Sequence, residues 1–215
     1  MKQNQKTKNL VLLALLCALL ILMAFTPLGY LRVWAISITF NMIPVAIGAI
    51  ALGNYAGALL GLIFGITSFV QCFGMDAFGT FLAEKNVFFA FIMCVVARVI
   101  AGFLTSVINK TFEKVISNIT VRCSLTGLAA SVLNTLLFVG SMVLLYGKMS
   151  VSEATGGAID SSVNIISFIA SICSINAVWE AIAAFIVTGA IGTGLYKARL
   201  ISSKKLVDKK EKENA

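Results

Sequence analysis

The sequence predicts an all-α integral membrane protein with six transmembrane helices and both termini on the cytoplasmic side. Apolar residues make up 59% of the 215 residues and charged residues only 12%. A soluble domain of this size would not stay dispersed with that balance. Six apolar stretches long enough to cross a bilayer, and an uneven distribution of Lys and Arg around them, complete the prediction.

The expected spans contain about 20 mainly apolar residues, which is the length that a helix needs to cross the hydrocarbon layer. They are residues 10–25, 36–52, 55–73, 87–108, 124–146 and 165–195. Only Gly53 and Asn54 separate the second from the third, which predicts a tight antiparallel hairpin. The sixth is too long for one straight span, so we expect it to start outside the hydrocarbon or to tilt.

Basic residues predict the orientation of these spans. Thirteen Lys and Arg residues lie in the N-terminus, the loop between the fourth and fifth spans, and the C-terminus, against three on the other side. Cytoplasmic loops carry such an excess, so both termini should be cytoplasmic. We expect one membrane domain over residues 1–202, a charged cytoplasmic tail over 203–215, and location in the cell membrane of a bacterium.

Composition also excludes several functions. Histidine is absent, which removes His-based metal sites and Ser-His-Asp triads. The five cysteines show no C-x-x-C spacing and lie mostly in apolar runs, as small hydrophobic residues of a membrane core do. The basic residues form no single patch, so no nucleic-acid partner is expected. We predict no catalytic residue, no metal site and no cofactor.

Small residues recur at helical spacing on two of the spans. Gly57, Gly61 and Gly65 form a tandem G-x-x-x-G motif, which lets helix backbones approach closely in lipid. We expect it to pack helices within the chain, a homodimer face being the alternative. Ala14 and Ala18 form a similar strip on the first span, which would accept either a partner subunit or another helix of this chain.

Polar residues within the spans point to a binding site. Glu180 lies in the last apolar stretch, where a carboxylate costs roughly 2.5–3.5 kcal/mol. Arg98 is equally deep in the fourth span, and Asn176 shares the Glu180 face one helical turn earlier. Arg98 and Glu180 would either pair with each other or contact a ligand. The further candidates for ligand contact are Asn134, Gln71 and Trp34.

Several of these segments resemble one family. The stretch ITFNMIPVAIGAIALGNYAGALLGLIFGITSF (38–69) resembles the second and third helices of the substrate-binding S components of energy-coupling factor (ECF) vitamin transporters. Ala14 and Ala18 match the family's A-x-x-x-A motif on helix one. The segment with Arg98 resembles its fourth helix, Asn134-Thr135 its fifth, and Asn176 with Glu180 its sixth.

This resemblance implies a fold and a mechanism. It implies a six-helix S-component bundle that binds a vitamin or related micronutrient from outside. The Ala14 and Ala18 face would then dock onto a transmembrane coupling subunit that carries two ATPase subunits. The chain lacks a G-x-x-x-x-G-K-[ST] phosphate loop, so ATP hydrolysis is expected in those partners and not here.

The substrate stays open at this point. Arg98 favours an anionic substrate such as pantothenate, because a guanidinium suits a carboxylate. If Arg98 pairs with Glu180 instead, other vitamins fit equally well. The alternative function is a stand-alone ion-coupled secondary transporter of a small polar solute, with Glu180 as the proton site. Such carriers usually contain internal repeats, and none is evident in this sequence.

Overall fold

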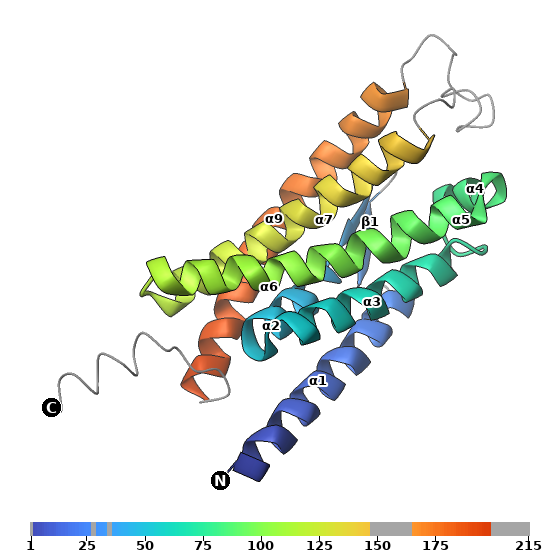
Figure 1. The fold of residues 1–215 in the computed structure, drawn as a ribbon. Coiled ribbons are helices and arrows are strands. Elements are labelled where there is room, and N and C mark those ends of the chain that lie inside the picture. Colours follow the sequence, from blue (N-terminus) through green and yellow to red (C-terminus); the bar gives the residue numbers. More distant parts are fainter. Residues whose placement is uncertain (1, 27–28, 34–35, 147–164, 199–215) are drawn as a thin grey trace, which may run out of the picture.

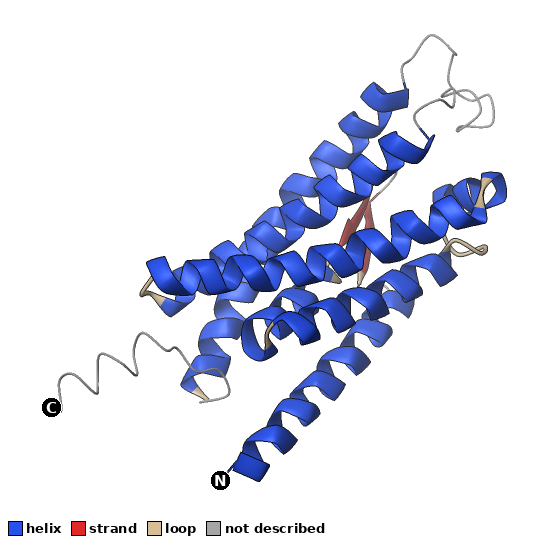
Figure 2. Ribbon diagram, in the orientation of Figure 1, coloured by secondary structure: helices blue, strands red, loops and turns tan. Residues whose placement is uncertain are grey.

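The computed structural model describes residues 2–26, 29–33, 36–146 and 165–198, which are almost entirely helical (Figure 2). In chain order the elements are α1 (Lys2–Phe25), β1 (Tyr30–Val33), β2 (Ile36–Thr39), α2 (Met42–Leu52), α3 (Asn54–Gln71), α4 (Ala77–Lys85), α5 (Val87–Phe91), a π-helical turn η1 (Ile92–Val96), α6 (Ala97–Val115), α7 (Ile119–Tyr146) and α9 (Ile165–Lys197). The tail predicted over 203–215 lies outside the described residues.

Five helical segments are long and apolar enough to cross a membrane. They are Lys6–Phe25, Asn54–Gln71, Val87–Val115, Ile119–Tyr146 and Asn176–Lys197. The described helix Met42–Leu52 is apolar but has only 11 residues. The sequence therefore predicts the positions of the long helices well, whereas the second expected span is much shorter than the 17 or so residues of an ordinary transmembrane helix.

The expected start of that second span, residue 36, is wrong. Ile36–Thr39 forms strand β2, which pairs antiparallel with β1, Tyr30 opposite Thr39 and Val33 opposite Ile36. The Phe40 amide extends the pairing by donating to the Gly29 carbonyl at 3.1 Å. Three of the four residues of β2 are β-branched, which favours a strand over a helix. Helix α2 begins only after this hairpin, at Met42.

Helix α2 lies at the centre of the bundle. Every residue from Met42 to Ile50 is buried. It packs against α1, α3, α6, α7 and α9, and its side chains form the main apolar cluster together with Leu16, Leu20 and Phe64. The outer helices present apolar side chains to their surroundings instead. Leu144 is 86% exposed and Leu10 is 69% exposed, as expected for surfaces that face lipid.

Glycines on α3 let this helix pack closely against η1 and α6 (Figure 1). A Cβ atom at Gly57 would lie 2.5 Å from the Gly102 carbonyl oxygen, and one at Gly65 would lie 2.7 Å from the Val95 Cα. A Cβ atom at Gly61 would meet the Arg98 carbonyl oxygen. The tandem G-x-x-x-G motif of α3 thus packs against η1 and α6 of the same chain, with the backbones in contact.

Helices α7 and α9 form the most extensive helix pair and run side by side in opposite directions (Figure 1). At Gly127 a Cβ atom would lie 2.6 Å from the Thr188 side chain, so this glycine permits the close approach. Antiparallel packing from that crossing brings residues later in α7 beside residues earlier in α9. Asn134, two turns beyond Gly127, therefore lies toward the part of α9 that carries Glu180.

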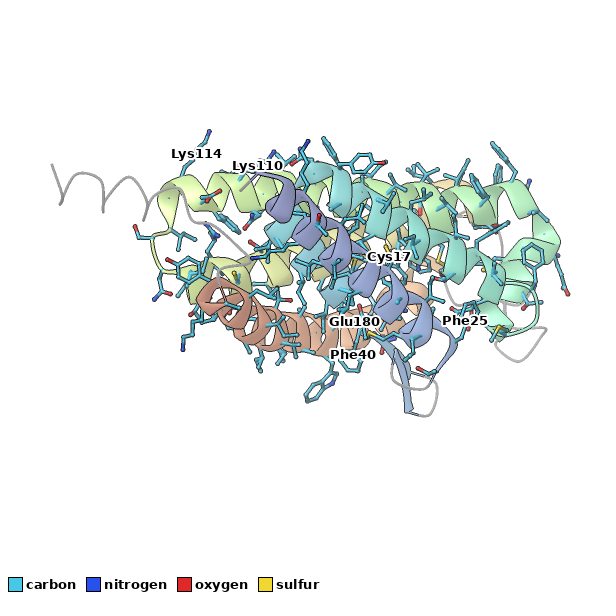
Figure 3. The ribbon with its side chains drawn as sticks, turned by 90° about the horizontal axis from the view of Figure 1, so that it is seen from below. Cys17, Phe25, Phe40, Lys110, Lys114 and Glu180 are labelled. Carbon is cyan, nitrogen blue, oxygen red and sulfur yellow. The ribbon has the colours of Figure 1, made fainter. Side chains whose placement is uncertain are left out.

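Most of the described basic residues gather at one end of the bundle. The start of α1, the α6–α7 connection and the end of α9 lie toward that end, whereas α4 and α5 lie toward the other (Figure 1). Lys110 and Lys114 lie together there (Figure 3). At the same end, the buried Arg122 forms an ion pair with Glu113, with Nη1 and Oε1 3.1 Å apart. The charge asymmetry seen in the sequence is thus an asymmetry in space.

Candidate functional site

Glu180 is bonded to the end of the β-hairpin. Its Oε1 atom accepts a hydrogen bond from the Thr39 backbone amide at 2.8 Å and another from the Thr39 hydroxyl at 2.7 Å. Figure 3 shows Glu180 beside Phe40, the next residue of the same connection. Hydrogen bonds to a carboxylate are shorter and stronger than bonds between neutral groups. The carboxylate therefore holds the entry to α2 against α9.

Arg98 is buried at the junction of η1 and α6, with 7% of its surface exposed. Its Nη1 atom donates to the Cys94 carbonyl at 3.0 Å and to the Met93 carbonyl at 3.4 Å. Both carbonyls belong to the π-helical turn η1, and such turns are frequent at functional sites. The local backbone thus holds one end of the guanidinium.

Two aromatic rings hold the guanidinium faces. The Arg98 Cζ atom lies 4.6 Å from the Phe64 ring centroid on α3 and 5.3 Å from the Phe138 ring centroid on α7. Stacking of this kind suits Arg better than Lys because the guanidinium is planar. The Nε atom is buried and has no hydrogen-bond partner among the described residues. A fixed cation with an unsatisfied donor can bind an anion.

Arg98 and Glu180 do not form an ion pair. The other buried arginine of the described residues, Arg122, does form an ion pair, with Glu113 at the basic end of the bundle. Arg98 lies against Phe138 on α7, and α7 packs along α9, so Arg98 lies toward the same α7–α9 part of the interior as Glu180. The sequence left two alternatives, that Arg98 and Glu180 pair with each other or that they contact a ligand. The direct pair is absent from the structure.

Three asparagines add unsatisfied amide groups to this region. The side-chain oxygens of Asn134 on α7 and Asn176 on α9 are buried without a partner in the described part of the chain. Asn41 is fully buried, and neither its nitrogen nor its oxygen has a partner there. Buried polar groups are nearly always satisfied in native proteins, so each such atom calls for a water or a ligand.

Sequence reasoning did not select Asn41. An asparagine directly before an apolar helix is typical of an N-cap, and Asn41 does occupy that position of α2. Its side chain makes no cap hydrogen bond, however, so the amide serves another purpose. Thr39, Phe64 and Phe138 were also missed, since nothing in their local sequence distinguishes them from ordinary strand and helix residues.

The remaining predicted contacts lie elsewhere or are not described. Gln71 is buried at the end of α3, and its Nε2 atom donates to the Ala24 carbonyl, which ties α3 to the end of α1. Trp34 lies outside the described residues. The structure therefore brings Arg98, Glu180, Asn134 and Asn176 to one region and places Gln71 at the α1–α3 contact.

The predicted docking strip lies on an uncovered helix face. Ala14 and Ala18 are exposed on α1, whereas Leu16 and Leu20 on its other side are buried in the core. Large apolar side chains flank the two alanines. Leu15 is 60% exposed and Leu22 is 51% exposed. The strip is thus a shallow, apolar surface that no other described helix covers.

Comparison with known proteins identifies the family. The family model described as "ECF transporter, substrate-specific component" matches residues 8–192. The chain is 28% identical to the pantothenic acid transporter PanT of Lactococcus lactis, over 92% of this chain and 98% of that protein. It is 29% identical to the pantothenate transporter PanT of Leuconostoc mesenteroides, over 89% and 94%. With its long apolar helices, this multi-pass bacterial membrane protein belongs to the family of substrate-specific components of ECF transporters.

Proposed function

We propose that this chain binds pantothenate as the substrate-specific subunit of an ATP-driven ECF importer. The observation that carries the proposal is the buried Arg98 guanidinium, which is held by two rings and two carbonyls while its Nε atom lacks a protein partner. Two relatives that match almost the whole chain are pantothenate transporters by name. Pantothenate carries one carboxylate, which supplies the anion that this site requires.

The rest of the site fits the other groups of this substrate. Pantothenate contains a secondary amide and two hydroxyls, which donate and accept hydrogen bonds. The unsatisfied amides of Asn41, Asn134 and Asn176 provide partners of the right kind. Glu180 acts by holding the Thr39 end of the hairpin in place.

The same proposal includes six spans with cytoplasmic termini. Helix α2, the second span in chain order, brings the five long spans to six. It can be short because the protein around it buries its residues from Met42 to Ile50. The end of the bundle that carries Lys6, Lys110, Lys114 and Lys197 is the cytoplasmic end, as the positive-inside rule requires. The site near Thr39 and Glu180 then opens toward the outside, where the vitamin is captured.

The proposed partners are a transmembrane coupling subunit and two ATPase subunits. The exposed Ala14 and Ala18 strip on α1 is the docking face, because small residues allow another helix to approach closely in lipid. ATP hydrolysis takes place in the ATPase subunits, since the sequence contains no phosphate loop. Binding and energy supply are thus divided between different chains.

Two measurements test the proposal. Radiolabelled pantothenate should bind to the purified chain in detergent, and an excess of unlabelled pantothenate, but not of thiamine or riboflavin, should displace it. In cells that lack the ECF coupling subunit and ATPases, this chain alone should support no uptake. Uptake that continues without those partners would instead establish the stand-alone carrier, and absence of pantothenate binding would reject this substrate.

A further inference from the structure

Two cysteine thiols from different elements face each other at the end of α3. The Sγ atoms of Cys72 and Cys94 are 3.7 Å apart, although 22 positions separate the two residues. Both residues are buried, Cys72 directly after α3 and Cys94 in η1. Cys17 and Cys123 have no such neighbour among the described residues.

Neighbouring groups fix the two thiols in this arrangement. The Cys72 thiol donates to the Ser68 carbonyl at 3.4 Å, and the Ser68 hydroxyl donates to the Cys94 sulfur at 3.9 Å. Both cysteines belong to one apolar cluster with Met93 and Tyr146. A disulfide requires sulfur atoms about 2.05 Å apart. The sulfur atoms are 3.7 Å apart, so a small rotation of the side chains together with a slight shift of η1 toward α3 would bring them to bonding distance.

We propose that Cys72 and Cys94 are a redox modification site that forms a reversible intramolecular disulfide. With hydrogen peroxide as the oxidant, one sulfur is oxidised to the sulfenic acid and the second thiol displaces its hydroxyl. The two thiols together lose two protons and two electrons, and the peroxide takes these up and is reduced to two water molecules. An external dithiol restores both thiols by exchange. In the proposed orientation the pair lies near the outer surface, where disulfides persist.

The disulfide reaches the candidate binding site through one hydrogen bond. The Cys94 carbonyl accepts from Arg98 Nη1 at 3.0 Å, so a bond that draws Cys94 toward α3 moves the group that supports the guanidinium. Oxidation therefore changes the affinity for an anionic substrate. This second step rests on the proposed function, whereas formation of the disulfide does not.

The test uses the full chain with Cys17, Cys123 and Cys173 replaced by Ser, which leaves only the proposed pair. Treatment with hydrogen peroxide should lower the intact mass by two hydrogen atoms and remove both thiols from maleimide labelling of the unfolded chain. A dithiol should restore them. Peptide mapping of the oxidised unmodified chain, which requires no substitution, should recover the Cys72 and Cys94 peptides as one linked species.

Three outcomes would overturn parts of this inference. A gain of oxygen atoms without a linked peptide would show oxidation of separate thiols and reject the pair. A linked peptide with identical pantothenate affinity before and after oxidation would reject the coupling to Arg98. A linked peptide in a chain that binds no pantothenate in either state would reject the proposed substrate and leave the modification site established.

Discussion

Glu180 and Thr39 are joined by two hydrogen bonds to one carboxylate oxygen, although 141 positions separate them in the chain. The backbone amide and the hydroxyl of Thr39 converge on Oε1 at 2.8 and 2.7 Å. This contact joins the last helix to the strand that precedes α2. Any change that weakens it frees the hairpin from α9 on the side of the bundle where Arg98 and the unsatisfied asparagines lie.

Replacing Glu180 with Gln should weaken pantothenate binding about tenfold, which corresponds to about 1.4 kcal/mol. The amide oxygen still accepts hydrogen bonds, but the charge that strengthens them is lost. Equilibrium binding of radiolabelled pantothenate to the purified variant measures the change. Thr39→Val, which removes the hydroxyl alone, should have a smaller effect, and the double variant should show less than the sum. Unchanged affinity in Glu180→Gln would show that the hairpin contact plays no part in binding.

Replacing Arg98 with Lys should lower the affinity at least about tenfold although the charge is kept. An ammonium group is not planar, so it cannot stack against the Phe64 and Phe138 rings as a guanidinium can or offer a carboxylate two parallel donors. The matched control is Arg122→Lys, which changes the other buried arginine at the opposite end of the bundle. If both variants bind pantothenate as tightly as the original chain, Arg98 does not hold its carboxylate.

Replacing Gly61 with Ala should lower the thermal midpoint and the affinity together. The added Cβ would meet the Arg98 carbonyl oxygen, so α3 and α6 must separate, at a cost of about 1–3 kcal/mol for overpacking. Gly140→Ala is the control, because a Cβ there has no neighbour within 4 Å. Thermal unfolding in detergent and pantothenate binding should both separate the two variants. Equal behaviour of the two would mean that α3 can move without cost.

Replacing Ala14 or Ala18 with Trp should abolish uptake and leave pantothenate binding unchanged. A large side chain on the exposed strip prevents close approach of a second helix but does not disturb the core behind it. Leu144→Trp adds similar bulk to another exposed apolar position and should transport normally. Uptake should be measured in cells that supply the complete ECF module. Normal uptake in both alanine variants would place the docking face elsewhere.

Replacing Glu113 with Gln should destabilise the chain by about 3 kcal/mol, the low end for leaving a buried charge without its partner. Arg122 is only 2% exposed and pairs with Glu113 at 3.1 Å. Glu84→Gln changes an exposed carboxylate and serves as the control. Thermal unfolding in detergent measures both. Because this pair lies far from the candidate site, pantothenate affinity should stay the same in either variant at temperatures where the chain is folded.

Hydropathy predicts the long helices because lipid imposes one strong requirement on every residue of a span. It does not predict β2, since an apolar strand of four residues that leads directly into an apolar helix looks like part of that helix. The sequence also offers no sign of the π-helical turn at Ile92–Val96, whose Cys94 carbonyl accepts a hydrogen bond from Arg98. Local pattern is informative only where one environment acts on many successive residues.

The polar residues illustrate the same distinction. The cost of ionisable groups in a membrane is enough to select Arg98 and Glu180 as important. Their partners are determined by packing between distant segments, so the most obvious pairing, of the two with each other, is not the one formed. Asn41 was overlooked because the expected span over 36–52 placed it inside a helix, whereas it precedes α2 and its side chain makes no cap hydrogen bond.

The burial of α2 has a consequence for how this protein is made. An 11-residue helix is about 16 Å long, roughly half the thickness of the hydrocarbon layer, so it cannot be recognised by the insertion machinery as a span in its own right. It must enter the bilayer together with α3, to which Gly53 joins it directly. Its final position then depends on the later arrival of α6, α7 and α9, so assembly of the binding region is completed only after α9 has been synthesised.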